Sequence, residues 1–126
     1  MSCRITELVL DCHDPATLSA WWCSVLDWVE LGRDTDDSIE IGPPEGFGGP
    51  VPTLVFNRTD DPRRGKLPLH LDVNATDRDQ DAELERLLEL GARRADVGQH
   101  EDVSWYVLAD PEGNEFCLLR RRVDPL

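Results

Sequence analysis

Basic residues are scarce relative to acidic ones in this sequence: 13 lysines and arginines stand against 26 aspartates and glutamates, for a formal net charge of −13. A surface this negative repels phosphate backbones and anionic lipid headgroups, which argues against nucleic-acid and membrane partners. The sequence also has no apolar run long enough to cross a bilayer, and its first residues lack the apolar segment of a signal peptide. We therefore expect a cytoplasmic protein.

Paired cysteines and a phosphate-binding loop are also missing. The four cysteines (Cys3, Cys12, Cys23 and Cys117) form no C-x-x-C pair, which excludes a zinc knuckle and a thioredoxin-like motif. In the cytoplasm they should stay reduced. The Gly/Pro-rich stretch 42–52 lacks the G-K-[ST] ending of a phosphate loop, so we interpret it as a lid or a connector.

The 126 residues suffice for a single domain with its own core. In the first half, a strand is predicted at 6–12, followed by a helix that Asp14 caps and Pro15 begins. Leu18, Trp21, Trp22, Val25 and Leu26 give this helix one apolar stripe. Three short strands are predicted next, around 28–33, 38–42 and 52–57.

The same order of elements is predicted again in the second half. A strand at 69–73 precedes a helix for which Thr76 together with Asp79 offers a cap. This helix runs through Leu90 and is stopped by Gly91. Leu84, Leu87 and Leu88 form the apolar stripe of this helix. Strands are predicted at 93–97, 103–109 and 115–120, the last after the turn "DPEGN".

This repetition, with an offset of 63 between Glu7 and His70, indicates an internal duplication. The predicted fold class is α+β, with two βαβββ modules, a cleft lined by mixed β-sheet, and helices on the outer face. The single domain at 1–126 would comprise module one at about 1–58, a linker at about 59–67 and module two at about 68–124.

Alternation within the strands separates an apolar face, which we expect under the helices, from a polar face. The polar faces carry the candidate site residues: Glu7, Asp11, Thr53, His70, Asp72 and Cys117. If the two halves pair, these faces line one shared concavity. A sheet whose outer face is only solvated accounts for the same pattern, and both interpretations are open. A lone histidine such as His70 is more often a hydrogen-bonded structural residue than a ligand.

Three stretches together resemble the vicinal oxygen chelate superfamily: "ELVLDCHDPATLSAWWCSVLDW", "LHLDV…LLELGA" and "LADPEGNEFCLL". The closer likeness is to its glyoxalase-like branch, which includes the bleomycin-resistance proteins. In metal-dependent members, the resemblance implies two histidines and two glutamates around a divalent ion that chelates paired substrate oxygens. These ligand positions fall on Glu7, Thr53, His70 and Cys117, and of these residues His70 alone is of the expected type.

The resemblance therefore leads us to favour no metal at the site. A three-ligand zinc site of Glu7, His70 and Cys117 is the alternative, since a thiolate prefers zinc or copper over the harder ions. Asp72 lies on the same face as His70 and would serve as a ligand or orient the imidazole.

Two functions follow from the resemblance. The first is a protein that binds a small organic molecule, cationic or polar, in the cleft between the modules without the usual four-ligand metal site. The second is a divalent-metal-dependent lyase, isomerase or dioxygenase of the glyoxalase type. The position of the usual base holds Cys117, and a thiol is a weak substitute for a carboxylate.

For Trp105 we expect core packing, with an apolar wall of the cleft as the alternative. The family also implies a homodimer.

Overall fold

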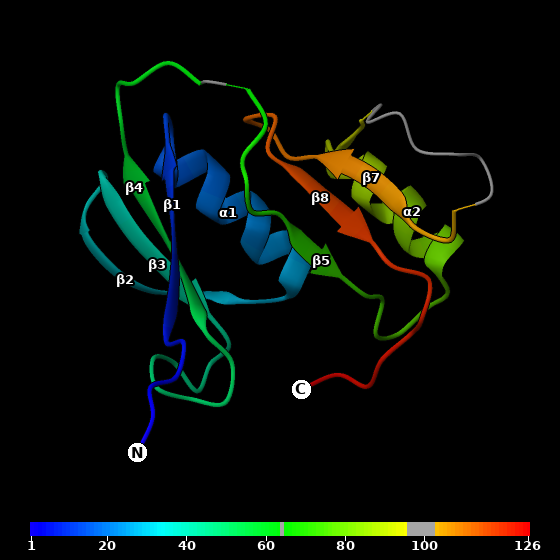
Figure 1. Cartoon of the computed structure of the whole chain (residues 1–126), viewed down its shortest axis with the longest axis horizontal. Coiled ribbons are helices and arrows are strands. Elements are labelled where there is room, and N and C mark those ends of the chain that lie inside the picture. The colour runs from blue at the N-terminus through cyan, green and yellow to red at the C-terminus, as the bar shows by residue number, and fades with distance from the viewer. Residues whose placement is uncertain (64, 96–102) are drawn as a thin grey trace. The chain divides into compact units, whose positions relative to one another are not determined.

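The computed structural model describes residues 1–63, 65–95 and 103–126, which divide into two compact units, Met1–Pro62 and Arg63–Leu126 (Figure 1). The elements of the first unit are β1 (Glu7–Cys12), α1 (Pro15–Leu26), β2 (Val29–Thr35), β3 (Ser38–Gly42) and β4 (Thr53–Arg58). Those of the second are β5 (Leu71–Val73), α2 (Gln80–Glu89), β6 (Arg93–Arg94), β7 (Tyr106–Ala109) and β8 (Glu115–Leu118). Each unit therefore runs strand, helix, three strands, as the sequence predicts.

Each unit contains one four-stranded mixed sheet of the same topology. The strand order is β1-β4-β3-β2 in the first unit and β5-β8-β7-β6 in the second. In both, the first strand pairs in parallel with the last one, and the remaining pairs are antiparallel. The predicted α+β class with two βαβββ modules is confirmed.

Both helices begin and end where the sequence signals predict. The Asp14 carboxylate accepts a hydrogen bond from the Thr17 backbone N–H at 3.1 Å, and Pro15 occupies the first turn of α1. Asp79 caps α2 by accepting a hydrogen bond from the Ala82 backbone N–H at 2.8 Å, and the helix begins at Gln80. Gly91 follows α2 with a φ of 106°, in the left-handed region that glycine adopts without strain. Neither helix in the described part of the chain has the length and apolar content that crossing a membrane requires.

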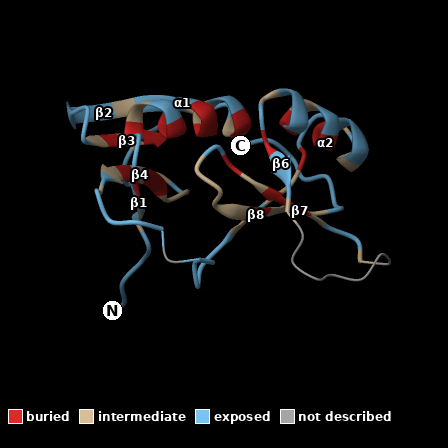
Figure 2. Cartoon of the chain, turned by 90° about the horizontal axis from the view of Figure 1, so that it is seen from above, coloured by how far each residue is buried: buried red, intermediate tan, exposed pale blue. Residues whose placement is uncertain are grey.

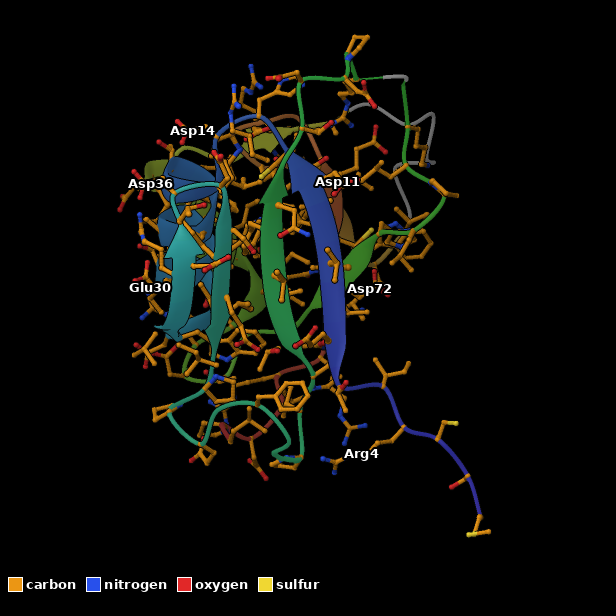
Figure 3. The ribbon with its side chains drawn as sticks, turned by 90° about the vertical axis from the view of Figure 1, so that its left-hand side faces the viewer. Arg4, Asp11, Asp14, Glu30, Asp36 and Asp72 are labelled. Carbon is orange, nitrogen blue, oxygen red and sulfur yellow. The ribbon has the colours of Figure 1, made fainter. Side chains whose placement is uncertain are left out.

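The core of the first unit lies between α1 and one face of its sheet. In Figure 3 the sheet faces the viewer and α1 lies behind it, and Figure 2 shows buried residues on the facing sides of the helix and the strands. Leu18 and Trp22 of α1 are buried together with Ile39, Ile41 and Phe56 of the sheet. The predicted apolar face is therefore the one that α1 covers.

In the second unit, α2 lies over one face of the sheet (Figure 2). Leu84 and Leu87 of the helix are buried, as are Leu108, Phe116 and Leu118 of the strands. The prediction that Leu88 belongs to the buried stripe of α2 is wrong. The side chain of Leu88 is 37% exposed.

The strands of the second unit are shorter than predicted. The strand expected at 69–73 begins at Leu71, the one expected at 103–109 begins at Tyr106, and the last one ends at Leu118. The strand expected at 93–97 is observed as Arg93–Arg94, and residues 96 and 97 lie outside the described part of the chain. His70 therefore precedes β5 by one residue instead of lying within a strand.

Candidate functional site

A pocket of about 370 Å³ opens on the second unit beside β8. Its lining combines charged, aromatic and aliphatic side chains from the segment before β5, from β5, β7 and β8, and from the residues that flank the last two strands. The lining residues are Lys66, His70, Asp72, Trp105, Val107, Glu115, Phe116, Cys117 and Leu119. Ligand sites commonly combine an apolar wall with a few convergent polar groups in this way.

The "DPEGN" turn sets the position of the strand that carries most of this pocket. Asp110 is fully buried, and its carboxylate accepts hydrogen bonds from the backbone N–H of Glu112 and Asn114, both at 2.9 Å, and from the Asn114 side-chain amide at 3.0 Å. Gly113 adopts a φ of 84°, which permits the tight reversal. The chain then enters β8 with Phe116 and Leu118 buried. Glu115 and Cys117 consequently lie on the opposite face, toward the pocket.

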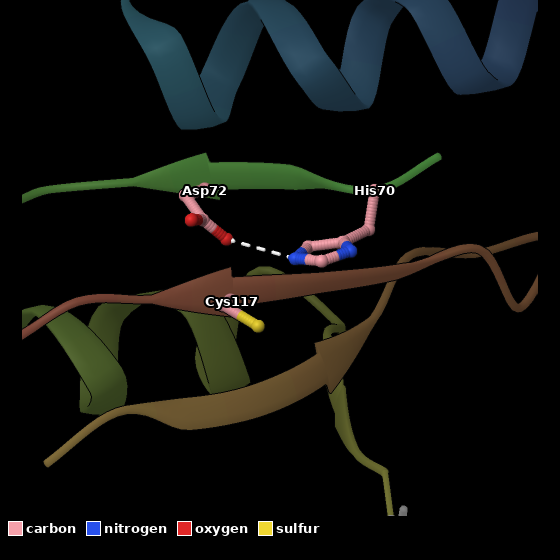
Figure 4. A group of neighbouring side chains, drawn as sticks. All are labelled: His70, Asp72 and Cys117. Atoms are coloured by element: carbon pink, nitrogen blue, oxygen red, sulfur yellow. Dashed lines mark ion pairs between the residues drawn. The ribbon is translucent and has the colours of Figure 1, made fainter. Parts of the chain in front are cut away.

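Three side chains converge at one point of the pocket. His70, Asp72 and Cys117 each offer one ligand atom, and these atoms lie within 4.8 Å of one another. The His70 Nε2 atom is 3.2 Å from the Asp72 Oδ1 atom, and Figure 4 shows the Cys117 sulfur on the neighbouring strand. The parallel pairing of β5 with β8 places Asp72 directly beside Cys117.

The surroundings of Cys117 keep its thiol protonated. Partial burial raises the pKa of this thiol, and the negative charge and hydrogen bonding of Asp72 raise the pKa further. The Lys66 ammonium opposes the increase. Because the thiolate is the nucleophilic form, Cys117 is a weak nucleophile and a weak base at neutral pH.

Glu115 is a pocket residue that the sequence prediction missed. Its Oε2 atom is buried and has no hydrogen-bond partner among the described residues, although the Lys66 Nζ atom lies 3.6 Å away. The signal was present in the sequence, because Glu115 shares its strand face with Cys117. The family motif points to Cys117 and not to Glu115.

Trp105 also differs from its prediction. We expected this residue to pack in the core, but its side chain is 39% exposed and lines the pocket. It precedes β7 by one residue. The alternative in which Trp105 forms a wall of a binding site therefore describes its environment better.

The other predicted site residues belong to the first unit. Glu7 and Asp11 are exposed on β1, on the face opposite α1, and Asp11 is labelled in Figure 3. Thr53 is fully buried, and its hydroxyl donates a hydrogen bond to the Glu40 Oε2 atom at 2.7 Å. Within the second unit, the structure brings His70, Asp72 and Cys117 together.

The sequence identifies the family. The model of the glyoxalase-like domain matches residues 7–119 of this chain. The chain belongs to the glyoxalase-like domain family. No curated protein matches the sequence.

Several solved structures share this fold at low sequence identity. A protein described as a possible glyoxalase from Bacillus cereus is 14% identical, with a TM-score of 0.68 over 94% of this chain and 99% of that one. A mutant of the fosfomycin resistance protein FosX from Listeria monocytogenes, in complex with Mn(II) and 1S,2S-dihydroxypropylphosphonic acid, is 12% identical, with a TM-score of 0.70 over 94% and 90%. TioX from Micromonospora sp. ML1 is 18% identical, with a TM-score of 0.58 over 94% and 98%.

The four ligands that the glyoxalase resemblance implies do not fit this chain. At the Thr53 position the side chain offers a neutral hydroxyl, and that hydroxyl already donates to Glu40. At the Cys117 position a thiol with a raised pKa replaces the carboxylate. A hard divalent ion prefers oxygen ligands, so this donor set is unsuited to manganese or magnesium.

Proposed function

We propose that this glyoxalase-like protein binds a small organic molecule through the pocket beside β8, without the four-ligand metal site of the metal-dependent family members. The observation that supports the proposal is the lining of the pocket. Trp105, Val107 and Leu119 offer an apolar surface, and the carboxylates of Asp72 and Glu115 are polar groups that orient a ligand. A net charge of −13 favours a cationic or polar molecule over an anion.

A fragment screen by two-dimensional NMR tests this function. We expect fragments that bind to shift the amide resonances of Val107, Cys117 and Leu119. The Trp105→Ala substitution should weaken the binding, because it removes the aromatic wall. Phe47→Ala is the matched control, since it removes an exposed aromatic side chain from the first unit. The absence of any pocket shift across a diverse library would reject the proposal.

A metal-dependent lyase, isomerase or dioxygenase of the glyoxalase type is the second candidate function. The cluster of His70, Asp72 and Cys117 supports it, because tetrahedral zinc with bonds of about 2.0 Å to nitrogen and oxygen separates those two ligand atoms by about 3.3 Å. The observed separation of the His70 and Asp72 atoms is 3.2 Å. The thiol of Cys117 makes zinc or copper the better match. An ion bound there would polarise paired substrate oxygens.

Metal analysis separates the two functions. The protein is purified without chelators, and the metal content is measured before and after loading with zinc, nickel and manganese. Stoichiometric metal that disappears in both His70→Ala and Cys117→Ser contradicts the metal-free function and supports the second one. If no metal is retained under any loading, the second function is rejected and the first stands.

Three further features stay predictions. The resemblance to the family implies a homodimer, which light scattering after gel filtration measures directly. The ligand that we propose is small, and the acidic composition argues against nucleic acid as a partner. Location in the cytoplasm is the expectation from the sequence.

A further inference from the structure

The described residues compensate the Glu115 carboxylate only in part. The side chain is 24% exposed, yet its Oε2 atom is buried and accepts no hydrogen bond from the described residues. Leaving an ionised oxygen desolvated without a donor is unfavourable for the folded protein. A ligand in the pocket is positioned to donate a hydrogen bond to this carboxylate, because Glu115 lines the pocket.

Lys66 is only a partial partner for this carboxylate. Its Nζ atom lies 3.6 Å from the Oε2 atom, which is longer than the 2.7–2.9 Å that is typical of a charge-assisted hydrogen bond. The lysine side chain is 62% exposed, so water and salt screen the attraction. The ammonium group nevertheless lines the same pocket. It therefore competes for Glu115 with any cation that a ligand brings.

The remaining lining favours a cation attached to an apolar body. Asp72 is a second carboxylate in the pocket, and Trp105 presents an aromatic side chain. An aromatic face attracts a cation and also packs against an apolar ring. Val107 and Leu119 extend the apolar surface.

We propose that Glu115 is the residue that selects the ligand, and that the ligand class is a small aromatic or apolar amine. In this arrangement the ligand ammonium donates a hydrogen bond to the Oε2 atom, and Lys66 moves away from it. The ring of the ligand lies against Trp105. This inference rests on the proposed small-molecule function and adds a charge and a selecting residue to it.

Three probes of similar size test the inference by NMR titration at low ionic strength: phenethylamine, phenethyl alcohol and phenylacetate. We expect phenethylamine to bind about tenfold more tightly than the alcohol, and phenylacetate to bind most weakly. Glu115→Gln should abolish the preference for the amine over the alcohol, because the neutral amide offers the ammonium no opposite charge. Lys66→Met should strengthen amine binding several-fold, because it removes the competing cation.

The matched control is Glu89→Gln, which removes one negative charge from an exposed position on α2. It distinguishes pairing with Glu115 from a general attraction of cations to an acidic protein, and it should keep the full preference for the amine. A second control, Asp72→Asn, tests the other carboxylate of the pocket. If Asp72→Asn abolishes the preference and Glu115→Gln does not, the assignment to Glu115 is overturned.

Failure of this inference is distinguishable from failure of the proposed function. Pocket resonances that shift equally with amine and alcohol overturn the role of Glu115, while small-molecule binding stands. Resonances that shift with none of the three probes count against both. The comparison of the probes on the unmodified protein needs no variant, so it holds even if a substitution impairs folding.

Discussion

The first unit places Val9 of β1 beside Val55 of β4, whereas the second unit places Asp72 of β5 beside Cys117 of β8. These two pairs occupy equivalent places in the repeated topology. The Val9–Val55 pair follows the pair of Leu8 with Leu54, and the Asp72–Cys117 pair follows the pair of Leu71 with Phe116. The same parallel strand pair thus carries two aliphatic side chains in one unit and an acid with a thiol in the other. The duplicated scaffold holds its polar cluster in the second unit.

Thr53 and Glu115 occupy equivalent positions in the two units. Thr53 immediately precedes Leu54 in β4, and Glu115 immediately precedes Phe116 in β8. Thr53 is buried and donates its hydrogen bond to Glu40, so its polar group is satisfied within the unit. Glu115 has a buried oxygen without such a donor among the described residues. A satisfied polar group stabilises a fold, and an unsatisfied one marks a place where binding can contribute. The equivalent positions of the two units therefore differ in hydrogen-bond satisfaction, and the binding role that we propose falls on the second unit.

The largest expected effect concerns the core of the first unit. Trp22 is nearly fully buried, so Trp22→Ala should lower the free energy of unfolding by about 3–5 kcal/mol. Urea denaturation followed by circular dichroism measures the change. Val9→Ala, on the exposed face of the same unit, should stay within about 0.5 kcal/mol of the unmodified protein. Similar losses for both variants would contradict the assignment of the two faces.

The buried turn of the second unit should give the next effect. Asp110→Ala removes a carboxylate that accepts three hydrogen bonds, and we expect a loss of about 2–3 kcal/mol. Asp124→Ala removes an exposed aspartate from the same unit and serves as the control. Equal stability of the two variants would show that the turn does not depend on this acceptor.

Thr53 and Glu115 test the comparison between the units directly. Thr53→Val keeps the shape of the side chain but leaves Glu40 without its donor, which should cost about 1–2 kcal/mol. Glu115→Gln should not lower stability, because the buried oxygen has no hydrogen bond to lose among the described residues and a neutral amide costs less to desolvate than a carboxylate. A large loss of stability in Glu115→Gln would assign that residue a structural role. It would contradict the proposed difference between the Thr53 and Glu115 positions.

The smallest effect concerns the reactivity of Cys117. The negative charge of Asp72 contributes to the raised pKa of this thiol, so Asp72→Asn should lower that pKa. A larger fraction of Cys117 should then be thiolate at neutral pH. We expect several-fold faster alkylation by iodoacetamide, measured on the Cys117 peptide by mass spectrometry. The pH midpoint of the reaction should shift downward in the variant. An unchanged midpoint would show that Asp72 does not influence the pKa of the Cys117 thiol.

Local signals predicted the elements of this fold well. Asp14, Pro15, Asp79 and Gly91 mark helix ends because capping and backbone conformation depend on a few neighbouring residues. The alternation in β1, β4 and β8 identified the covered faces for a similar reason, since successive side chains of a strand point to opposite sides. The ends of the second unit's short strands were less predictable, because they depend on which backbone groups find partners.

The site was predicted in part. His70, Asp72 and Cys117 were named from the strand faces and from the family motif. Their convergence depends on the register between β5 and β8, which no local pattern encodes. Glu115 and Trp105 were missed or misassigned, because exposure and hydrogen-bond satisfaction depend on residues that are distant in the sequence.

The sequence by itself determined the order of the elements, the helix caps, the "DPEGN" turn and the acidic character of the surface, since each follows from short-range chemistry or from composition. The tertiary structure decided which polar residues meet. It brought Asp72 beside Cys117, buried the oxygen of Glu115 without a donor from the described residues, and left Trp105 at the wall of a pocket. The physical reason is that parallel strand pairing joins segments more than forty residues apart, and its register alone fixes the facing side chains.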